Sequence, residues 1–251
     1  MRKKLTFLLI SFIGFTNVSQ AQNWGGGIDD DWFNWGFQFQ YIVSEYKLTK
    51  KQNWRQPFLD PETGQYVTDE LNAISSPTSP GFGIGFVLNT NLHKNIDMRF
   101  TPSLVFNDRL VRYDYIPTAS DPMFTHERTV EKKVQATMVD FPVGFKVKSD
   151  RLMNFRAYML GGLKYSVDLA SSKKTNDVNA SSIDKLLKNK KGFLSYEAGL
   201  GFDIYFEYFK MSPEVKVSYS FNDILKHDIN PYASPIEKAK LRHFTFSLFF
   251  E

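Results

Sequence analysis

The sequence contains no cysteine, and this absence removes several functions at once. Without thiols the chain can form neither a disulfide nor a thiolate metal site, and it has no cysteine nucleophile. Its four histidines, His93, His126, His227 and His243, are scattered, and none has the spacing of a metal-binding motif such as HExxH. The sequence therefore predicts neither a metal site nor a cofactor.

Long hydrophobic runs are also missing, and the longest apolar stretch lies at the start of the chain. A basic segment, Arg2–Lys4, precedes an apolar core over residues 5–15, and small residues precede a cleavage position after Ala21. The core is shorter than the roughly 20 apolar residues that a transmembrane helix needs. We predict a secretory signal peptide over residues 1–21. No cysteine follows it, so a lipoprotein anchor is excluded.

A strong excess of one charge is absent too. The chain has 31 Lys and Arg against 27 Asp and Glu, and three of the basic residues fall in the predicted signal peptide, which leaves 28 against 27. A nearly neutral mature chain gives little electrostatic support to nucleic-acid binding. No feature of the sequence points to a small-molecule substrate.

What the sequence has is aromatic residues in alternation. Aromatic residues make up 16% of the chain, with 24 Phe and 12 Tyr. Eight segments place apolar residues on one face and polar residues or glycine on the other, with a period of two that an α-helix could not use. These predicted strands cover residues 33–43, 81–88, 96–106, 139–147, 155–168, 194–204, 214–221 and 243–250.

Short and long links alternate between these segments without exception. The short links lie near residues 89–95, 149–151 and 207–210, and the long ones cover 44–80, 107–133, 170–191 and 222–240. Short periplasmic turns and long extracellular loops are typical of outer-membrane barrels. We predict an all-β protein: one eight-stranded antiparallel transmembrane β-barrel over residues 22–251, with 22–31 as a flexible periplasmic lead-in. It would lie in the lipid of a Gram-negative outer membrane with both termini in the periplasm.

The polar faces of the predicted strands carry eleven charged residues that would point into the lumen. An eight-stranded barrel is just wide enough to be filled by side chains, and unpaired buried charges are costly, so we expect a filled, ion-paired lumen. The alternatives are a selective pore or a proton path. The eleven residues are Asp97, Arg99, Asp140, Lys146, Arg156, Lys164, Asp168, Glu197, Asp203, Glu214 and Lys216.

Glycine and proline add details to the predicted strands. Gly81, Gly83 and Gly85 share the inward face of one strand, where we expect them to relieve crowding. The prolines inside predicted strands, Pro102, Pro142 and Pro213, should each break a hydrogen bond of the ladder or lie at a bulge. Tyr113 and Tyr115 suggest that the third and fourth strands extend beyond the membrane.

The long links contain two candidate contact surfaces. Trp54, Phe58 and Tyr66 are apolar residues outside the bilayer, so we expect them to pack over the barrel mouth or to meet a protein partner. The basic loop over residues 170–191 could contact an acidic surface glycolipid or a protein, or simply be solvated. His243 and Ser247 share the inward face of the last strand, but no oriented acid or oxyanion hole accompanies them, so we predict no enzyme activity.

Three segments give the chain a resemblance to the PorT family of Bacteroidota outer-membrane proteins. They are Asp31–Gly36 in the first strand, Met138–Lys146 in the fourth, and the pair Gly161-Gly162 in the fifth. The resemblance covers the mature chain and supplies no catalytic motif. It implies an accessory component of the type IX secretion system, which exports proteins with a C-terminal sorting domain and, in gliding species, adhesins. It also implies a local bulge at Pro142.

The predicted function is therefore support of protein secretion by a non-enzymatic barrel, through contact with other secretion-system proteins. The alternative is a structural or adhesive barrel, or a small-solute porin, with no role in secretion.

Overall fold

The computed structural model describes residues 32–116, 129–169 and 185–251. The predicted signal peptide and lead-in lie outside these ranges. Within them no helix is long and apolar enough to cross a membrane. The strands are β1 (Phe33–Lys50), β2 (Glu70–Ser75), β3 (Ser79–His93), β4 (Ile96–Phe100), β5 (Ser103–Phe106), β6 (Arg109–Ile116), β7 (Thr129–Val134), β8 (Thr137–Lys148), β9 (Phe155–Asp168), β10 (Gly192–Tyr205), β11 (Lys210–Ser220) and β12 (Ile236–Phe250).

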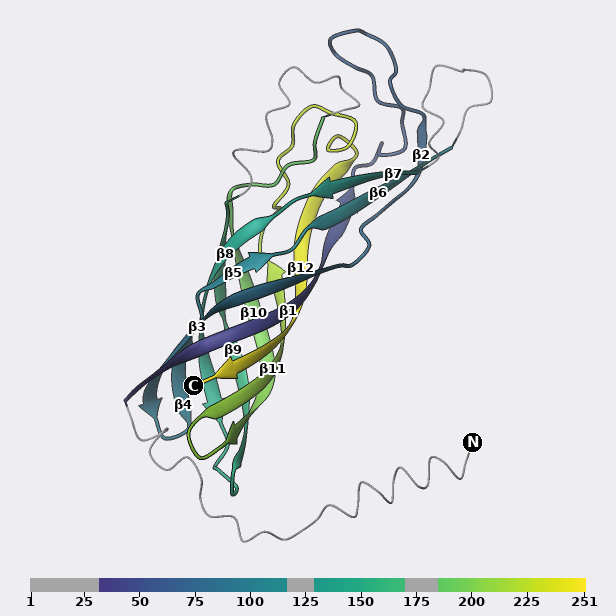
Figure 1. Ribbon diagram of the computed structural model, residues 1–251. Helices are drawn as coiled ribbons and strands as arrows, with labels where there is room; N and C mark the ends of the chain where they lie inside the picture. Colours follow the sequence, from purple (N-terminus) through teal and green to yellow (C-terminus); the bar gives the residue numbers. More distant parts are fainter. Residues whose placement is uncertain (1–31, 117–128, 170–184) are drawn as a thin grey trace, which may run out of the picture.

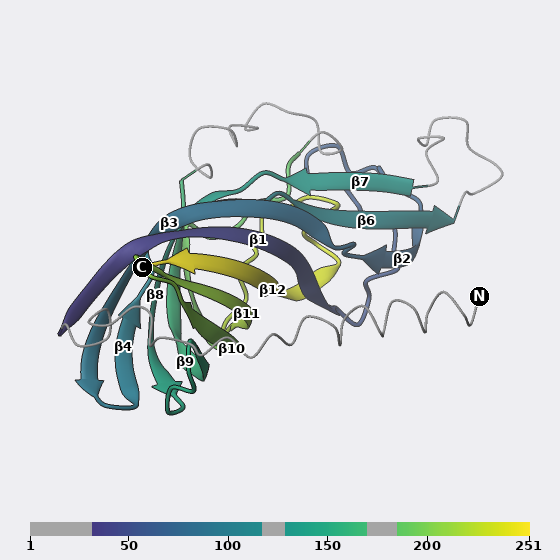
Figure 2. The ribbon, with the colours of Figure 1, turned by 60° about the horizontal axis from the view of Figure 1, so that its bottom comes forward.

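Nine of these strands form one closed antiparallel ring. Its order is β1-β12-β11-β10-β9-β8, then β4 and β5, then β3, which pairs back with β1. Strands β4 and β5 are two parts of one wall strand, because both lie between β3 and β8. The wall therefore has eight positions and no open edge (Figures 1 and 2), which confirms the predicted eight-stranded barrel.

Prolines interrupt the ladder of the wall without inserting a residue. Thr101 and Pro102 separate β4 from β5, yet the register against β8 is the same on both sides of the gap. Pro142 pairs with Lys164 in an unbroken register, so the bulge expected there is wrong. Pairing between β10 and β11 lapses around Pro213 and resumes in the same register. A proline lacks the N–H that the ladder would use, and the wall loses that bond without shifting its faces.

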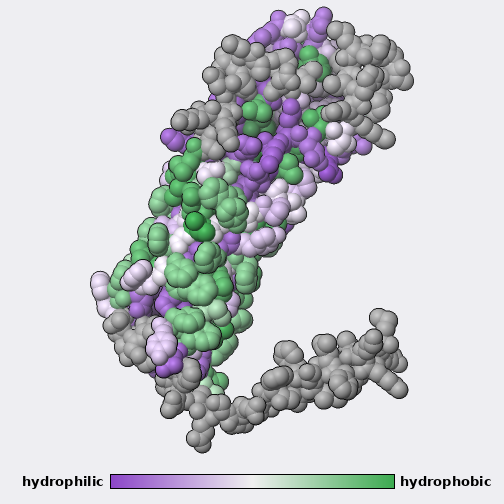
Figure 3. Space-filling model, viewed as in Figure 1, coloured by the Kyte–Doolittle hydropathy of each residue, from purple (hydrophilic) through white to green (hydrophobic). Residues whose placement is uncertain are grey.

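A hydrophobic band surrounds the part of the barrel near the short turns. Figure 3 shows it as the green surface below the more hydrophilic long-loop side. On β1 the outward aromatic residues from Phe33 to Tyr41 are 44–69% exposed. At about 3.3 Å per residue the segment 33–43 covers about 36 Å, which at a tilt of about 40° gives a height of about 28 Å. This height matches the apolar band of roughly 25 Å that outer-membrane barrels present to lipid.

The two ends of the barrel differ in construction. The turns between β3 and β4, β8 and β9, and β10 and β11 are short, and β1 begins and β12 ends at this same short-turn end. The other end carries the long loops and a second sheet in the order β2-β6-β7 (Figure 1). Strands β6 and β7 continue the hairpin of β5 and β8, as Tyr113 and Tyr115 suggested, whereas β2 was not predicted.

Buried apolar residues fill the mouth of the barrel at the long-loop end. We call this group the apolar cap, and it combines inward residues of the wall, residues of the second sheet and residues of the long loops. The Tyr113 hydroxyl donates to the carbonyl of Tyr232 over 2.8 Å, which joins the second sheet to the last loop. The apolar cap includes Ile42, Tyr46, Leu71, Ile74, Val105, Val111, Tyr113, Tyr115, Val134, Met138, Leu187, Phe193, Ile224, Leu225, Tyr232, Ile236 and Leu241.

Asp223 anchors the last loop to β12. Its Oδ1 accepts hydrogen bonds from the backbone N–H groups of Ala239 (2.7 Å) and Leu225 (3.3 Å). Partial burial raises the pKa of Asp223, but these N–H donors, together with the side chains of His227 and Lys190, bring it below its ordinary value. The neighbouring Ile224 and Leu225 are thereby held in the apolar cap.

Close backbone approach explains a glycine on the seam between β1 and β12. A Cβ at Gly36 would overlap the carbonyl of Phe250, whereas a Cβ at Gly161 would meet nothing within 4 Å. We expect Gly36→Ala to destabilise the barrel by about 1–3 kcal/mol through overpacking, and Gly161→Ala to have little effect. Urea unfolding in lipid vesicles measures both, and equal stabilities of the two variants would contradict this reading.

Gly83 lies on the strand where we predicted that inward glycines relieve crowding. A Cβ at Gly83 would lie 3.0 Å from Oε1 of Gln40.

Candidate functional site

The lumen is the part of the molecule where the predicted charged residues lie. The structure buries ten of the eleven in the barrel: Asp97, Arg99, Asp140, Lys146, Lys164, Asp168, Glu197, Asp203, Glu214 and Lys216. The eleventh, Arg156, is half-buried, with its guanidinium 5.8 Å from the ring of Tyr205. Strand alternation accounts for this placement, because every second residue of a barrel strand faces inward.

Four further charged side chains, which were not among the predicted eleven, are buried there: Arg109, Lys148, Lys210 and Glu251. Lys148 and Glu251 continue the alternation of inward residues along β8 and β12. Extending each predicted segment by one residue would therefore have found them. Lys210 begins β11 directly after a short turn, and Arg109 begins β6 beyond the band. With these additions, seven acidic and seven basic side chains of the described residues are buried in the barrel, and their formal charges balance.

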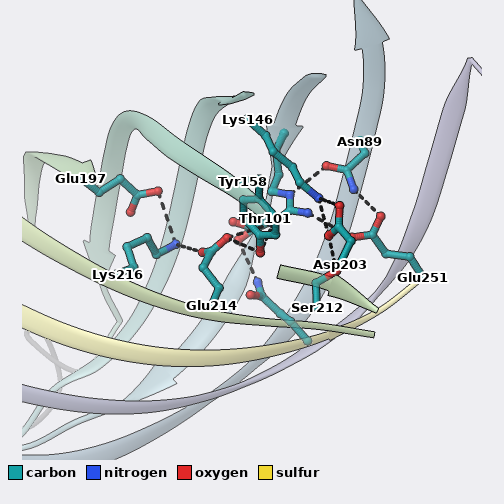
Figure 4. Close-up of polar contacts among 12 residues, drawn as sticks. Asn89, Thr101, Lys146, Tyr158, Glu197, Asp203, Ser212, Glu214, Lys216 and Glu251 are labelled. Atoms are coloured by element: carbon teal, nitrogen blue, oxygen red, sulfur yellow. Dashed lines mark hydrogen bonds and ion pairs between the residues drawn. The ribbon is translucent and has the colours of Figure 1, made fainter. Parts of the chain in front are cut away.

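Arg99 joins three sides of the lumen. Its Nη1 lies 3.0 Å from Oε2 of Glu214 on β11, and its Nη2 lies 3.2 Å from Oε1 of Glu251 at the end of β12. Its Nε donates to Oδ1 of Asn89 on β3 over 2.8 Å. Figure 4 shows Asn89, Glu214 and Glu251 within this group of polar contacts. Glu251 also pairs with Lys210, at 2.9 Å. One guanidinium therefore cross-links strands that are far apart in the sequence.

A second buried pair lies beside it. Nζ of Lys146 donates to both carboxylate oxygens of Asp203, at 2.7 and 2.8 Å, and the Ser212 hydroxyl donates to Oδ1 of Asp203 over 2.7 Å. The same ammonium lies 4.0 Å from the ring centroid of Tyr158, whose hydroxyl donates to Glu214 over 3.0 Å. Both members of the Lys146–Asp203 pair are fully buried. Tyr158 therefore links this pair to the cluster around Arg99 (Figure 4).

Other pairs extend the network along the lumen. Lys216 lies 3.4 Å from Glu197 and 3.8 Å from Glu214. Lys164 lies 3.2 Å from Asp140, and on the short-turn side Lys148 lies 2.7 Å from Asp97. All of these side chains are at most 6% exposed. The charged side chains thus fill the lumen within the hydrophobic band, and the apolar cap fills it toward the long loops.

His243 and Ser247, which share the inward face of the last strand, are buried in the lumen, at 2% and 0% exposure. Nδ1 of His243 lies 3.1 Å from Nζ of Lys164, so a lysine occupies the position where a serine hydrolase has its orienting acid. Among the described residues, Nε2 of His243 and the Ser247 hydroxyl have no hydrogen-bond partner, so they do not bond to each other. The geometry supports no nucleophile–base pair here.

In the ranges 32–116, 129–169 and 185–251 no three acidic or histidine side chains lie in an arrangement that could hold a metal ion.

The three aromatic residues of the first long loop have different surroundings. Trp54 is half-buried against the apolar cap, with Nζ of Lys50 at 4.0 Å from its ring. Phe58 is half-buried, and its N–H donates to Oγ1 of Thr68. Tyr66 is 58% exposed and forms a β-bridge with Leu59, which is 49% exposed. Trp54 therefore packs over the barrel mouth, while Leu59 and Tyr66 form an exposed apolar pair that we call the hairpin tip.

A cleft lies next to the hairpin tip. It has a volume of about 420 Å³ and is lined by parts of three long loops, namely residues 60–62, Lys185 with Lys188, and residues 228–230. Asp60, Glu62 and Asp228 supply acidic groups, and Lys185 and Lys188 supply basic ones. Because the cleft carries both acidic and basic groups, it suits contact with a polar protein surface better than binding of an ion of one sign.

Comparison with known proteins places the chain in a family. The model of the family described as "Outer membrane protein beta-barrel domain" matches residues 11–226. None of the curated proteins matches the chain.

Three of the similar solved structures are small outer-membrane proteins. OprG from Pseudomonas aeruginosa is 13% identical, with 86% of this chain and 94% of that one covered and a TM-score of 0.43. Neisserial surface protein A is 8% identical, with 87% and 98% covered and a TM-score of 0.37. Ail of Yersinia pestis, solved in complex with the heparin analogue sucrose octasulfate, is 10% identical, with 86% and 96% covered and a TM-score of 0.35. The chain itself, matched over most of its length, belongs to the outer membrane protein beta-barrel domain family.

Proposed function

We propose that this barrel supports protein export as a non-enzymatic accessory component of the type IX secretion system, the role that its resemblance to the PorT family implies. Its long-loop end faces outward, both termini lie in the periplasm, and the signal peptide is removed after Ala21. The filled lumen carries the proposal: ion pairs and the apolar cap occupy the space that a solute or a cargo would need. The protein therefore contributes by contact with other proteins.

The long-loop end offers the surface for that contact. The second sheet and the loops are folded onto the apolar cap, so they present a defined shape. On this shape the hairpin tip exposes Leu59 and Tyr66 beside the mixed-charge cleft. Apolar and aromatic side chains that remain exposed on a folded surface are the usual anchors of protein contacts. Trp54 acts indirectly, because it packs beneath the loop that carries the tip.

The same observations give less support to the alternatives. A small-solute porin needs an open lumen, and this lumen is filled. An adhesive role through the basic loop would depend on residues 170–184, which lie outside the described ranges. In the described remainder, Lys188 lies 3.7 Å from Asp228 and Lys190 lies 3.3 Å from Asp223, so part of the positive charge is already neutralised within the protein.

Deletion of the gene tests the proposal. Proteins with C-terminal sorting domains should disappear from the culture medium and accumulate in the periplasm, because the export machinery lacks a component it contacts. Mass spectrometry of both fractions, with and without the wild-type gene on a plasmid, measures the change. An unchanged distribution of these proteins would contradict the proposal and favour an adhesive or permeability role.

Complementation of the deletion strain with two variants locates the contact. Leu59→Ser with Tyr66→Ser removes the hairpin tip and should restore less than half of the export. The matched control, Leu152→Ser with Met153→Ser, removes two exposed apolar residues at the short-turn end and should restore export fully. Full export with the tip variant, or equal loss in both, would exclude the tip as the contact.

A further inference from the structure

Four cations gather on the outer wall of the barrel, on the long-loop side of the hydrophobic band. Along β12 the outward positions are Lys238, Lys240 and Arg242, and the next outward residue, Phe244, belongs to the band. On the neighbouring β1, Lys47 takes the corresponding position. We call these four residues the cationic patch. Its charges begin where the apolar surface ends, since Arg242 and Phe244 are successive outward residues.

The pairing of β1 with β12 brings like charges together. Lys47 lies directly opposite Lys240, and Lys238 is the next outward residue after Lys240 on the same strand. Like charges opposite each other in a sheet are destabilising. Among the described residues, no carboxylate pairs with Lys240, whose side chain is exposed. The wall therefore holds a repulsive arrangement that a bound anion would relieve.

Two acidic residues accompany the patch and leave it with an excess of positive charge. Glu45 pairs with both Lys47, at 3.0 Å, and Arg242. Glu237 lies 3.8 Å from Lys238, and these two side chains are 50% and 58% exposed. Four cations and two carboxylates give the patch a net formal charge of +2, which an external anion would neutralise.

Aromatic residues fix Arg242 in position. Its Nη1 donates to the hydroxyl of Tyr219 over 3.2 Å, and its guanidinium lies 4.8 Å from the ring of Phe244 and 5.9 Å from that of Tyr219. Tyr and Trp side chains commonly mark the level of the lipid headgroups on such barrels. A guanidinium held at this level suits a phosphate, because its planar fork matches phosphate oxygens.

We propose that the cationic patch binds the phosphate groups of a membrane lipid whose acyl chains lie along the adjacent hydrophobic band. The occupant must carry negative charge at the level of Lys47 and Lys240 and apolar chains at the level of Phe244. A phosphorylated lipid has both in that order. This inference goes beyond the secretion role and does not depend on it.

Native mass spectrometry of the full chain in a non-ionic detergent tests the proposal. The probes are diphosphorylated lipid A, phosphatidylcholine and inorganic phosphate, each added separately. The test variant is Lys47→Gln with Lys238→Gln and Lys240→Gln. The control, Lys94→Gln with Arg112→Gln and Lys133→Gln, removes the same number of exposed cations elsewhere. We expect the wild type and the control to retain lipid A, and the test variant to retain it at least tenfold less, with phosphatidylcholine retained equally by all three.

Two results would overturn the proposal. One is equal retention of lipid A by the test variant and the wild type. The other is that inorganic phosphate alone binds the wild type but not the test variant, and that it displaces lipid A when both are present at equal concentration. That result would make the patch a site for a soluble anion. Because the assay uses purified protein, a failure of the secretion prediction would leave its result unchanged.

Discussion

Replacing Lys146 by methionine should lower the free energy of unfolding of the barrel by about 3–5 kcal/mol, because the carboxylate of Asp203 would remain buried without its ion-pair partner. The two side chains are 0% exposed and their charged atoms lie 2.7 Å apart. The Ser212 hydroxyl would be left as a neutral donor to the carboxylate. Urea unfolding in lipid vesicles, followed by tryptophan fluorescence, measures the loss.

A matched control exists on the surface. Lys133 and Asp108 lie 2.8 Å apart, but their side chains are 55% and 41% exposed. Lys133→Met should therefore cost at most about 1 kcal/mol, since water solvates the remaining carboxylate. The double variant Lys146→Met with Asp203→Leu should regain most of the loss, because it removes both buried charges. Similar losses for Lys146→Met and Lys133→Met would show that the lumen is wet and that its ion pairs are not buried.

The faces of the wall strands were predictable because the physical cause is local. The alternation of large apolar and polar residues over 33–43 allows only one orientation of the strand in a lipid-embedded sheet. In that orientation Phe37 and Phe39 face outward and Gln38 faces inward. The alternation of inward and outward residues continues through Pro102, so one pattern predicted which residues of both β4 and β5 face inward. A missing ladder hydrogen bond does not change which face a residue occupies.

Contacts across the lumen could not be read from the sequence. Alternation places Arg99 and Glu214 inside, but they are 115 residues apart, and which inward residues meet depends on the stagger of all eight strands. The predicted set was also too small, because it stopped short of Lys148, the last inward residue of β8, and of Glu251, which directly follows β12.

The apolar cap was missed for a different reason. Strand β2 is six residues long, and its partner β6 lies more than 30 residues further along the chain, so no local pattern announces the pairing. Ile224 and Leu225 lie in a polar loop and become buried because that loop is tied to β12, through Asp223 and through the hydrogen bond from the N–H of Ile224 to the carbonyl of Ala239. A short apolar pair in a loop is not distinguishable by pattern from an exposed one.

The lumen is sealed at two levels, and the proposed role in secretion therefore falls to the outer surface of the protein. Within the band, paired charges such as Lys146–Asp203 occupy the space, and an ion entering it would have to displace them. Toward the long loops, the apolar cap offers an entering ion no polar groups to replace its water.

Conductance across a planar lipid bilayer containing the purified full chain tests this claim most directly. An open porin in the same bilayer serves as the positive control. A change in gel mobility on heating verifies that the barrel was folded before it was heated. We expect no steady conductance from the wild type at any holding voltage that leaves the bilayer intact. A steady, voltage-proportional current from the folded wild type would contradict it and would make this barrel a pore.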